Sequence, residues 1–190
     1  FLCLPARQGR SYHPAGAEFT YGEINTRAGE LVSVYERAGY GHGHRVALLL
    51  ENRPEFFYHF LALNSLGASV VPINPDYVHG EVAYQLEHSD AALVIAVSSR
   101  VSDVRRAGEA TIQGVPVVDA ELISEGLPPA AVPAPCDDAP RLSSECAMLY
   151  TSGTTGRPKG CILSNQYFIT AGQWYLNVGG VATLVEEGER

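Results

Sequence analysis

The chain has 190 residues, and its 46% hydrophobic and 18% charged content is ordinary for a globular domain with a real core. A formal net charge of −8, with Lys159 as the only lysine, argues against a basic surface that binds nucleic acid. No apolar run reaches the roughly 18 residues of a membrane span, and no signal peptide is visible, so we expect a cytoplasmic protein without a membrane span.

Strands and helices are predicted to alternate along residues 1–123. The opening "FLCLPA" is a candidate strand, and residues 21–38 carry apolar side chains at helical spacing behind a capping box of Thr20 and Glu23. Short apolar runs predict strands at 45–51, 68–75, 91–97 and 115–119. Two more helices are predicted at 79–88 and 100–109. Because the strands are apolar throughout, we expect an α/β fold whose mostly parallel sheet is flanked by helices.

Another helix is predicted between the strands at 45–51 and 68–75. Asn52 and Glu55 would cap its start, Pro54 fits its first turn, and Gly67 would end it. Its apolar side is predicted to consist of Phe56, Phe57, Phe60, Leu61 and Leu63.

The region after residue 123 divides into two parts. Residues 124–141 hold five prolines without periodicity and indicate a surface linker. Residues 142–190 begin with the candidate strand "ECAMLYT" and continue through a polar loop and the strand "CIL". A helix is then predicted at 165–177 with Ser164 as its cap. We interpret 1–123 and 142–190 as parts of one incomplete domain.

The polar loop lies in "LYTSGTTGRPKGCILS", residues 149–164. Four hydroxyls and two glycines fall within residues 151–156, and Lys159 adds a positive charge, so backbone amides, hydroxyls and the ammonium group could together bind a polyphosphate. The alternative is a solvated Gly/Ser/Thr turn. Neither G-x-x-x-x-G-K-[ST] nor G-x-G-x-x-G occurs, so this is not a P-loop or a dinucleotide fingerprint.

"YTSGTTGRPKG" resembles the phosphate-binding signature of the adenylate-forming (AMP-binding) superfamily. "FTYGEIN" and "RVALLLENRPEFFYHFLALNSLGASVVPINP" resemble earlier segments of the same family, in the same order. The "NP" dipeptide and "GCILSNQYF" look more like acyl-CoA synthetases than amino-acid adenylation domains. A peptide-synthetase adenylation domain, a non-catalytic nucleotide-binding module and a scaffold with a vestigial loop remain alternatives.

The resemblance implies a two-step ligation. A carboxylate attacks the α-phosphate of Mg²⁺–ATP, and a thiol, usually that of coenzyme A, then displaces AMP. The loop would grip the β- and γ-phosphates. The implied ATP-binding residues are Thr151, Ser152, Gly153, Thr154, Thr155, Gly156 and Lys159.

The rest of the family's machinery does not appear in residues 165–190, so we expect no catalytic residue and no protein metal ligand in this chain. Met148 is the only methionine, which also suggests a piece of a longer protein. We therefore expect the chain alone to be inactive and to self-associate through apolar faces left uncovered.

For the remaining candidate residues we favour structural roles over metal or ligand binding. The four cysteines form no C-x-x-C pair and are expected to be buried or semi-buried free thiols in a reducing compartment. His42 and His44 flank Gly43, and a surface turn is favoured there over a metal site. Asp137 and Asp138 are expected to be solvated. Core packing is favoured over an acyl pocket for Tyr167, Phe168, Trp174 and Tyr175.

Overall fold

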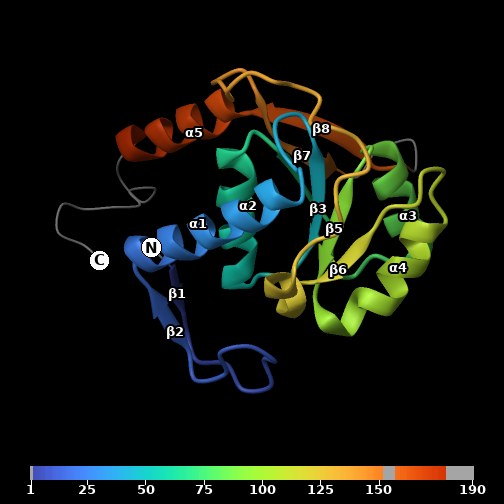
Figure 1. Ribbon diagram of the computed structural model, residues 1–190. Helices are drawn as coiled ribbons and strands as arrows, with labels where there is room; N and C mark the ends of the chain where they lie inside the picture. The colour runs from blue at the N-terminus through green and yellow to red at the C-terminus, as the bar shows by residue number, and fades with distance from the viewer. Residues whose placement is uncertain (1, 152–156, 179–190) are drawn as a thin grey trace.

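The computed structural model describes residues 2–151 and 157–178. A six-stranded sheet with the order β6-β5-β3-β4-β7-β8 forms the centre of the molecule (Figure 1). Five of its strands run parallel, and the last is antiparallel to its neighbour. The strands are β3 (Arg45–Leu49), β4 (Ser69–Pro72), β5 (Leu93–Ala96), β6 (Val117–Asp119), β7 (Glu145–Thr151) and β8 (Lys159–Ser164). This arrangement confirms the predicted α/β fold and its mostly parallel sheet.

Helices cover both faces of the sheet (Figure 1). The chain steps from β3 to β4 in one direction and from β4 to β5 in the other, so right-handed crossovers place the connecting helices on opposite faces. One face carries α1 (Tyr21–Arg37) and α2 (Pro54–Ser65). The other carries α3 (His79–His88) and α4 (Val101–Glu109). The short 3-10 helices η1 (Ser98–Arg100) and η2 (Ala120–Glu125) complete the connections.

Both chain-terminal regions add elements outside the parallel sheet. The predicted first strand exists as β1 (Leu2–Leu4), but it pairs antiparallel with β2 (Ala17–Phe19) in a separate two-stranded sheet. The last described element is α5 (Asn165–Val178), whose Ser164 cap is confirmed because the Ser164 hydroxyl accepts a hydrogen bond from the Tyr167 amide at 3.3 Å.

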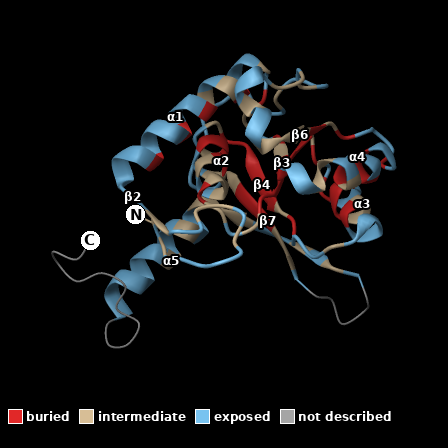
Figure 2. Ribbon diagram, turned by 90° about the horizontal axis from the view of Figure 1, so that it is seen from below, coloured by how far each residue is buried: buried red, intermediate tan, exposed pale blue. Residues whose placement is uncertain are grey.

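Buried side chains are concentrated in the central strands and the helix faces that cover them (Figure 2). All four residues of β5 are buried, and so are Val46–Leu49 of β3. One polar pair lies inside this core. The Tyr35 hydroxyl of α1 and Nδ1 of His59 in α2 are 2.7 Å apart, and both residues are almost fully buried.

The start and the buried face of α2 differ from the sequence expectation. Arg53, not Asn52, occupies the N-cap position and makes no side-chain capping bond, although Pro54 is in the first turn as expected. Phe57 and Leu61 are 38% and 41% exposed. The buried residues of the helix are Pro54, His59, Ala62 and Leu63. The helix thus buries a histidine because Tyr35 satisfies its ring nitrogen, which apolar periodicity alone cannot predict.

The proline-rich residues 124–141 are packed more closely than a simple linker. The Ala130 amide donates to the Ala38 carbonyl at 2.8 Å, and the Cys136 amide donates to the His42 carbonyl at 3.1 Å. Nε2 of the buried His44 lies 3.1 Å from the Val132 carbonyl. The segment is therefore bonded along the turn that joins α1 to β3. The division at residues 123 and 141 stays a prediction.

A bidentate ion pair connects the amino-terminal ends of β3 and β7. Arg45 Nε and Nη2 donate to the two carboxylate oxygens of Glu145 at 2.7 and 2.8 Å, and Nη1 donates to the Ser89 carbonyl at 3.1 Å. Burial opposes ionisation of Glu145, but the hydrogen bonds from Arg45 and Ser69 and the charge of Arg45 together outweigh it, so the pKa of Glu145 lies below its ordinary value. The pair fixes β7, and hence the hairpin that follows it, to the central sheet.

Within residues 2–151 and 157–178, no helix combines the length and the apolar character needed to cross a membrane.

Candidate functional site

The candidate phosphate loop is the connection of the antiparallel hairpin β7–β8. Thr151, the last residue of β7, pairs with Lys159, the first residue of β8, and both are exposed. The predicted contacts Ser152, Gly153, Thr154, Thr155 and Gly156 lie outside the described residues. The hairpin register thus brings one predicted hydroxyl and the only lysine of the chain to opposite sides of the loop's base.

The loop follows the carboxyl end of a parallel strand. β7 runs parallel to β4, and β4 runs parallel to β3, so the ends of these three strands lie at the same edge of the sheet. In open α/β sheets, ligands bind at the carboxyl edge. The position of the loop therefore agrees with the sequence interpretation of a ligand-binding segment.

Tyr84 of α3 fixes the exit of the loop. Its hydroxyl donates a hydrogen bond to the Pro158 carbonyl at 3.1 Å. The guanidinium carbon of Arg157 lies 5.5 Å from the centre of the Tyr84 ring, within the range of a cation–π contact. One side chain of α3 therefore contacts two consecutive residues that precede Lys159.

His88, one helical turn after Tyr84, fixes the strand that leads into the loop. Its Nδ1 lies 2.7 Å from the Tyr150 hydroxyl, and its ring centre is 5.4 Å from that of Tyr84. Burial raises the pKa of Tyr150 to about 12, so its hydroxyl stays protonated at neutral pH and can donate to the histidine. Tyr84 and His88 together attach both sides of the loop's base to α3.

The opposite face of the hairpin is attached to α2. The Asn64 side-chain amide donates to the Cys146 carbonyl at 2.9 Å and to the Ala68 carbonyl at 3.1 Å. The Cys146 thiol donates back to Asn64 Oδ1 at 2.7 Å. Burial raises the pKa of Cys146 to about 11, so this thiol is neutral and is not a nucleophile at physiological pH.

The described part of the site can bind and orient an anion. Lys159 and Arg157 are exposed cations at the base of the loop, and Thr151 supplies a hydroxyl beside them. An ammonium group, a guanidinium group and a hydroxyl are donors that phosphate oxygens accept well. Sequence reasoning named Lys159 and Thr151 as candidates, and their place in the site stays a prediction. It did not name Tyr84, His88 and Tyr150, which contact the base of the loop. Only the i, i+4 spacing of Tyr84 and His88 indicated that they share one helix face.

A separate cavity of about 490 Å³ lies at the carboxyl ends of β3 and β4. Its wall is mostly apolar and includes Leu2, Leu4, Leu50, Phe56 and Ile73, with Glu51, Asn52 and Arg53 as polar members. None of its lining residues belongs to the described base of the phosphate loop.

Three structural interpretations from the sequence need correction. Cys3, Cys136 and Cys161 are exposed, and of the four cysteines only Cys146 is buried as expected. His44 is not in a solvated surface turn, because only 3% of it is exposed and burial lowers its pKa. Core packing was wrong for Tyr167, Trp174 and Tyr175, which are 53%, 57% and 44% exposed on α5. Phe168 does contact another aromatic ring, that of Phe60, with ring centres 5.8 Å apart.

The model of the family described as "AMP-binding enzyme" matches residues 6–185. The chain belongs to this family. The match includes the β7–β8 hairpin and nearly all of the described fold, so the resemblance inferred from the loop extends across the molecule.

Members of this family that resemble the chain include a ligase and a peptide synthetase. 4-coumarate–CoA ligase 3 of Oryza sativa subsp. japonica is 34% identical over 163 residues, which cover 82% of this chain and 29% of the ligase. Tyrocidine synthase 3 of Brevibacillus parabrevis is 32% identical over 158 residues, or 82% of this chain and 2% of the synthase.

A solved structure is similar to this chain in both fold and sequence. The inhibitor-bound N-terminal domain of FACL13 from Mycobacterium tuberculosis superposes with a TM-score of 0.65 at 32% identity, covering 78% of this chain and 38% of that one. The chain therefore spans well under half the length of these relatives and of this structure.

Proposed function

We propose that the chain is the N-terminal, ATP-phosphate-binding part of an ATP-dependent acyl-CoA synthetase. The observation that carries this proposal is the family match over residues 6–185, combined with the pairing of Lys159 and Thr151 at the base of the loop. The length supports a partial enzyme, because the chain covers only 29% of the rice ligase.

The proposed reaction has two steps and is assigned to the full-length parent. A carboxylate oxygen attacks the α-phosphorus of ATP, the bond to the β-phosphate breaks, and pyrophosphate leaves. The sulfur of coenzyme A then attacks the acyl carbon, and AMP leaves with the electrons of the broken C–O bond. The substrates are accordingly a small carboxylic acid, ATP and coenzyme A.

The residues of this chain would act by binding and positioning. Lys159 would pair with the β- and γ-phosphates, and Thr151, Ser152, Gly153, Thr154, Thr155 and Gly156 would donate hydroxyl and amide hydrogen bonds to them. Bound Mg²⁺ would neutralise phosphate charge. Lys159 and Thr151 are exposed at the base of the loop. They fit phosphates bound to Mg²⁺, because they leave the phosphate oxygens room to contact the ion.

Tyr84 is proposed as a positioning residue for this loop. Tyr84→Phe removes the hydrogen bond to the Pro158 carbonyl but keeps the aromatic ring beside Arg157. We expect the Kd of Mg²⁺–pyrophosphate for the chain to rise about fivefold, because one neutral hydrogen bond contributes roughly 1 kcal/mol.

Isothermal titration calorimetry measures this effect, and Tyr77→Phe serves as the matched control. Tyr77 precedes α3. Its backbone carbonyl accepts a hydrogen bond from Arg100, and its side chain packs against the core. An unchanged Kd in Tyr84→Phe would remove this residue from the proposed site.

ATP–pyrophosphate exchange tests the proposed function. We expect the 190-residue chain alone to catalyse no exchange, and the full-length parent to catalyse exchange that depends on an added carboxylic acid. Robust exchange by the isolated chain would contradict its assignment as a binding part. Absence of exchange in the parent with every acid tested would contradict the assignment as a ligase.

An amino-acid adenylation domain is the second candidate, favoured by the 32% identity to tyrocidine synthase 3. The two candidates differ in the acid that the parent activates. A panel of aryl and aliphatic acids beside the amino acids, each trapped as its hydroxamate, separates them. We favour the acyl-CoA synthetase and expect exchange with the acids that lack an α-amino group.

Self-association of the isolated chain also stays a prediction. Figure 2 shows α5 as largely exposed, and its exposed residues include the apolar Trp174, Leu176 and Val178, which support this prediction.

A further inference from the structure

We propose that His42, Cys136 and Asp138 form a zinc-binding site outside the nucleotide site. The His42 ring nitrogen, the Cys136 sulfur and a carboxylate oxygen of Asp138 all lie within 4.8 Å of one another. Asp138 Oδ1 is 3.3 Å from His42 Nδ1. These three donors come from parts of the chain about a hundred residues apart, so the site exists only in the folded protein.

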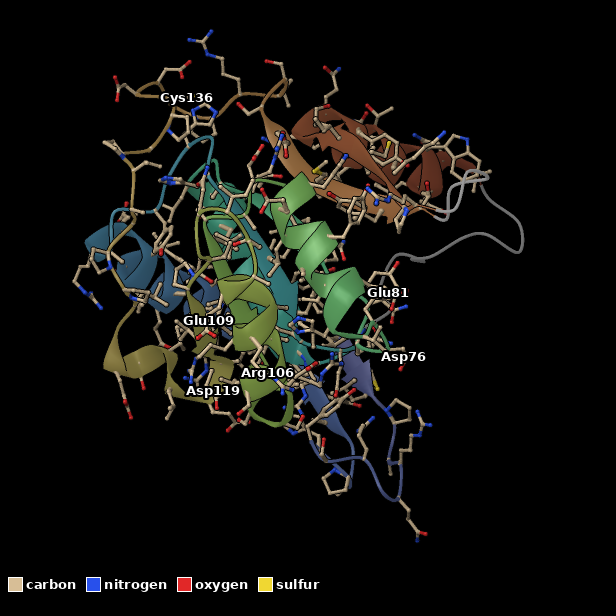
Figure 3. The ribbon with its side chains drawn as sticks, turned by 90° about the vertical axis from the view of Figure 1, so that its right-hand side faces the viewer. Asp76, Glu81, Arg106, Glu109, Asp119 and Cys136 are labelled. Atoms are coloured by element: carbon tan, nitrogen blue, oxygen red, sulfur yellow. The ribbon has the colours of Figure 1, made fainter. Side chains whose placement is uncertain are left out.

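The site lies at the edge of the sheet opposite to the phosphate loop. His42 precedes β3, so it is near the amino ends of the parallel strands, whereas the loop follows the carboxyl end of β7. Figure 3 shows Cys136 at the upper margin of the molecule, away from Asp76 and Glu81 near the start of α3. A metal at this place would therefore not take part in the proposed ligation.

The backbone around the three side chains is already held in place. The Cys136 amide donates to the His42 carbonyl at 3.1 Å, which aligns the two segments. The His42 ring packs directly against Gly67, where an added Cβ would lie 2.7 Å from its Cδ2 atom. Gly43, next to His42, lies similarly close to the Pro135 ring. Pre-formed backbone geometry lowers the cost of assembling a metal site.

The donor set matches the ligand preference of Zn²⁺. Imidazole nitrogen, thiolate sulfur and carboxylate oxygen bind zinc at about 2.0–2.3 Å, which places tetrahedral ligands roughly 3.2–3.8 Å apart. Closing the present separations needs a side-chain movement of about 1 Å. Cys136 is exposed and the Asp138 side chain is 52% exposed, so both have room to rotate. Three protein ligands leave a fourth position for water.

The hydrogen bonds of His42 can accommodate the exchange of a proton for the metal. In the metal-free protein, Nδ1 lies 2.8 Å from the Asp138 carbonyl, and Nε2 lies 3.0 Å from Ser144 Oγ. Zinc on Nδ1 would replace the hydrogen bond to the Asp138 carbonyl, which must move aside, while Nε2–H donates to Ser144 Oγ, an arrangement typical of metal-bound histidines. Ser144 Oγ also accepts from the Arg141 amide at 2.9 Å, and its two lone pairs suffice for both bonds.

Titration of the reduced 190-residue chain with Zn²⁺ by calorimetry, and with Co²⁺ by absorption, tests the site. We expect one equivalent to bind, with release of the thiol proton and a cobalt–thiolate charge-transfer band. Cys136→Ser should abolish the band and raise the Kd for Zn²⁺ about tenfold or more. Cys3→Ser, which removes another exposed thiol, should change neither.

Two further variants test the other two ligands, because an exposed thiol can bind metal by itself. His42→Gln and Asp138→Asn should each weaken Zn²⁺ binding about tenfold, whereas His79→Gln, an exposed histidine on α3, should leave it unchanged. Circular dichroism checks that each variant is folded. Absence of saturable binding, or equal binding by wild type and Cys136→Ser, would overturn the proposal.

Discussion

The Lys159→Ala variant should bind Mg²⁺–pyrophosphate about 10- to 100-fold more weakly than the wild-type chain. A hydrogen bond to a charged group contributes roughly 1.5–3 kcal/mol, and each 1.4 kcal/mol changes the Kd tenfold. Lys159 is the only lysine in the chain, and its pairing with Thr151 places it at the base of the loop. We expect the loss to be large because Arg157, the other exposed cation at this base, lies against the Tyr84 ring.

Arg106→Ala is the matched control for this variant. It also removes one exposed cation, but Arg106 is on α4 (Figure 3). There it pairs with Asp103 at 3.3 Å. Its side chain is 72% exposed, so the pair contributes little to stability. Isothermal titration calorimetry gives both affinities at the same ionic strength. Equal Kd values for the two variants would show that Lys159 acts only through net charge.

The second large expected effect is that the chain loses stability in mild acid because His59 is buried. Burial lowers the pKa of His59 from 6.5 to about 3 in the folded protein. The unfolded chain therefore binds a proton at this residue between pH 6.5 and pH 3, while the folded chain does not. Stability falls as the pH decreases through that window. Between pH 7 and pH 4, the free energy of unfolding should decrease by about 3 kcal/mol from this residue.

Urea denaturation at a series of pH values measures this loss. His59→Gln keeps a side-chain acceptor for the Tyr35 hydroxyl but has no titrating ring, so its stability should depend much less on pH in this range. The exposed His79→Gln variant should keep the wild-type slope. A residual slope is expected from His44, whose pKa is also lowered by burial. The wild-type slope in His59→Gln would contradict the assignment.

The fold could be predicted largely because the strands are apolar and regularly spaced. The helix expected at 79–88 has those bounds in the structure, and the strand expected at 91–97 became the shorter β5, Leu93–Ala96. The strand order could not be read from the sequence, since it depends on which strand edges pair. β8 was predicted as a strand, but its antiparallel direction follows from the short hairpin that joins it to β7.

From the sequence, only those residues of the candidate site that belong to a local motif could be proposed. Thr151 and Lys159 were found because they belong to one contiguous segment. Tyr84 and His88 lie more than sixty residues before the loop and reach it through the packing of α3, so no local pattern identifies them. For His42 a surface turn was favoured over a metal site, and Cys136 and Asp138 were placed in a linker, so the sequence did not predict that the three side chains lie together. The backbone bonds of residues 130–136 bring Cys136 and Asp138 to His42.

The central claim is that the β7–β8 loop binds polyphosphate, and amide NMR during a Mg²⁺–ATP titration tests it most directly. We expect the largest shift changes at Gly153 and Gly156 inside the loop and at Thr151 and Lys159 at its base. Gly126, which follows η2, should not change. Saturable changes confined to the loop and the adjoining residues of α3 would support the claim. Binding with no change at Gly153 and Gly156, or with changes centred elsewhere, would contradict it.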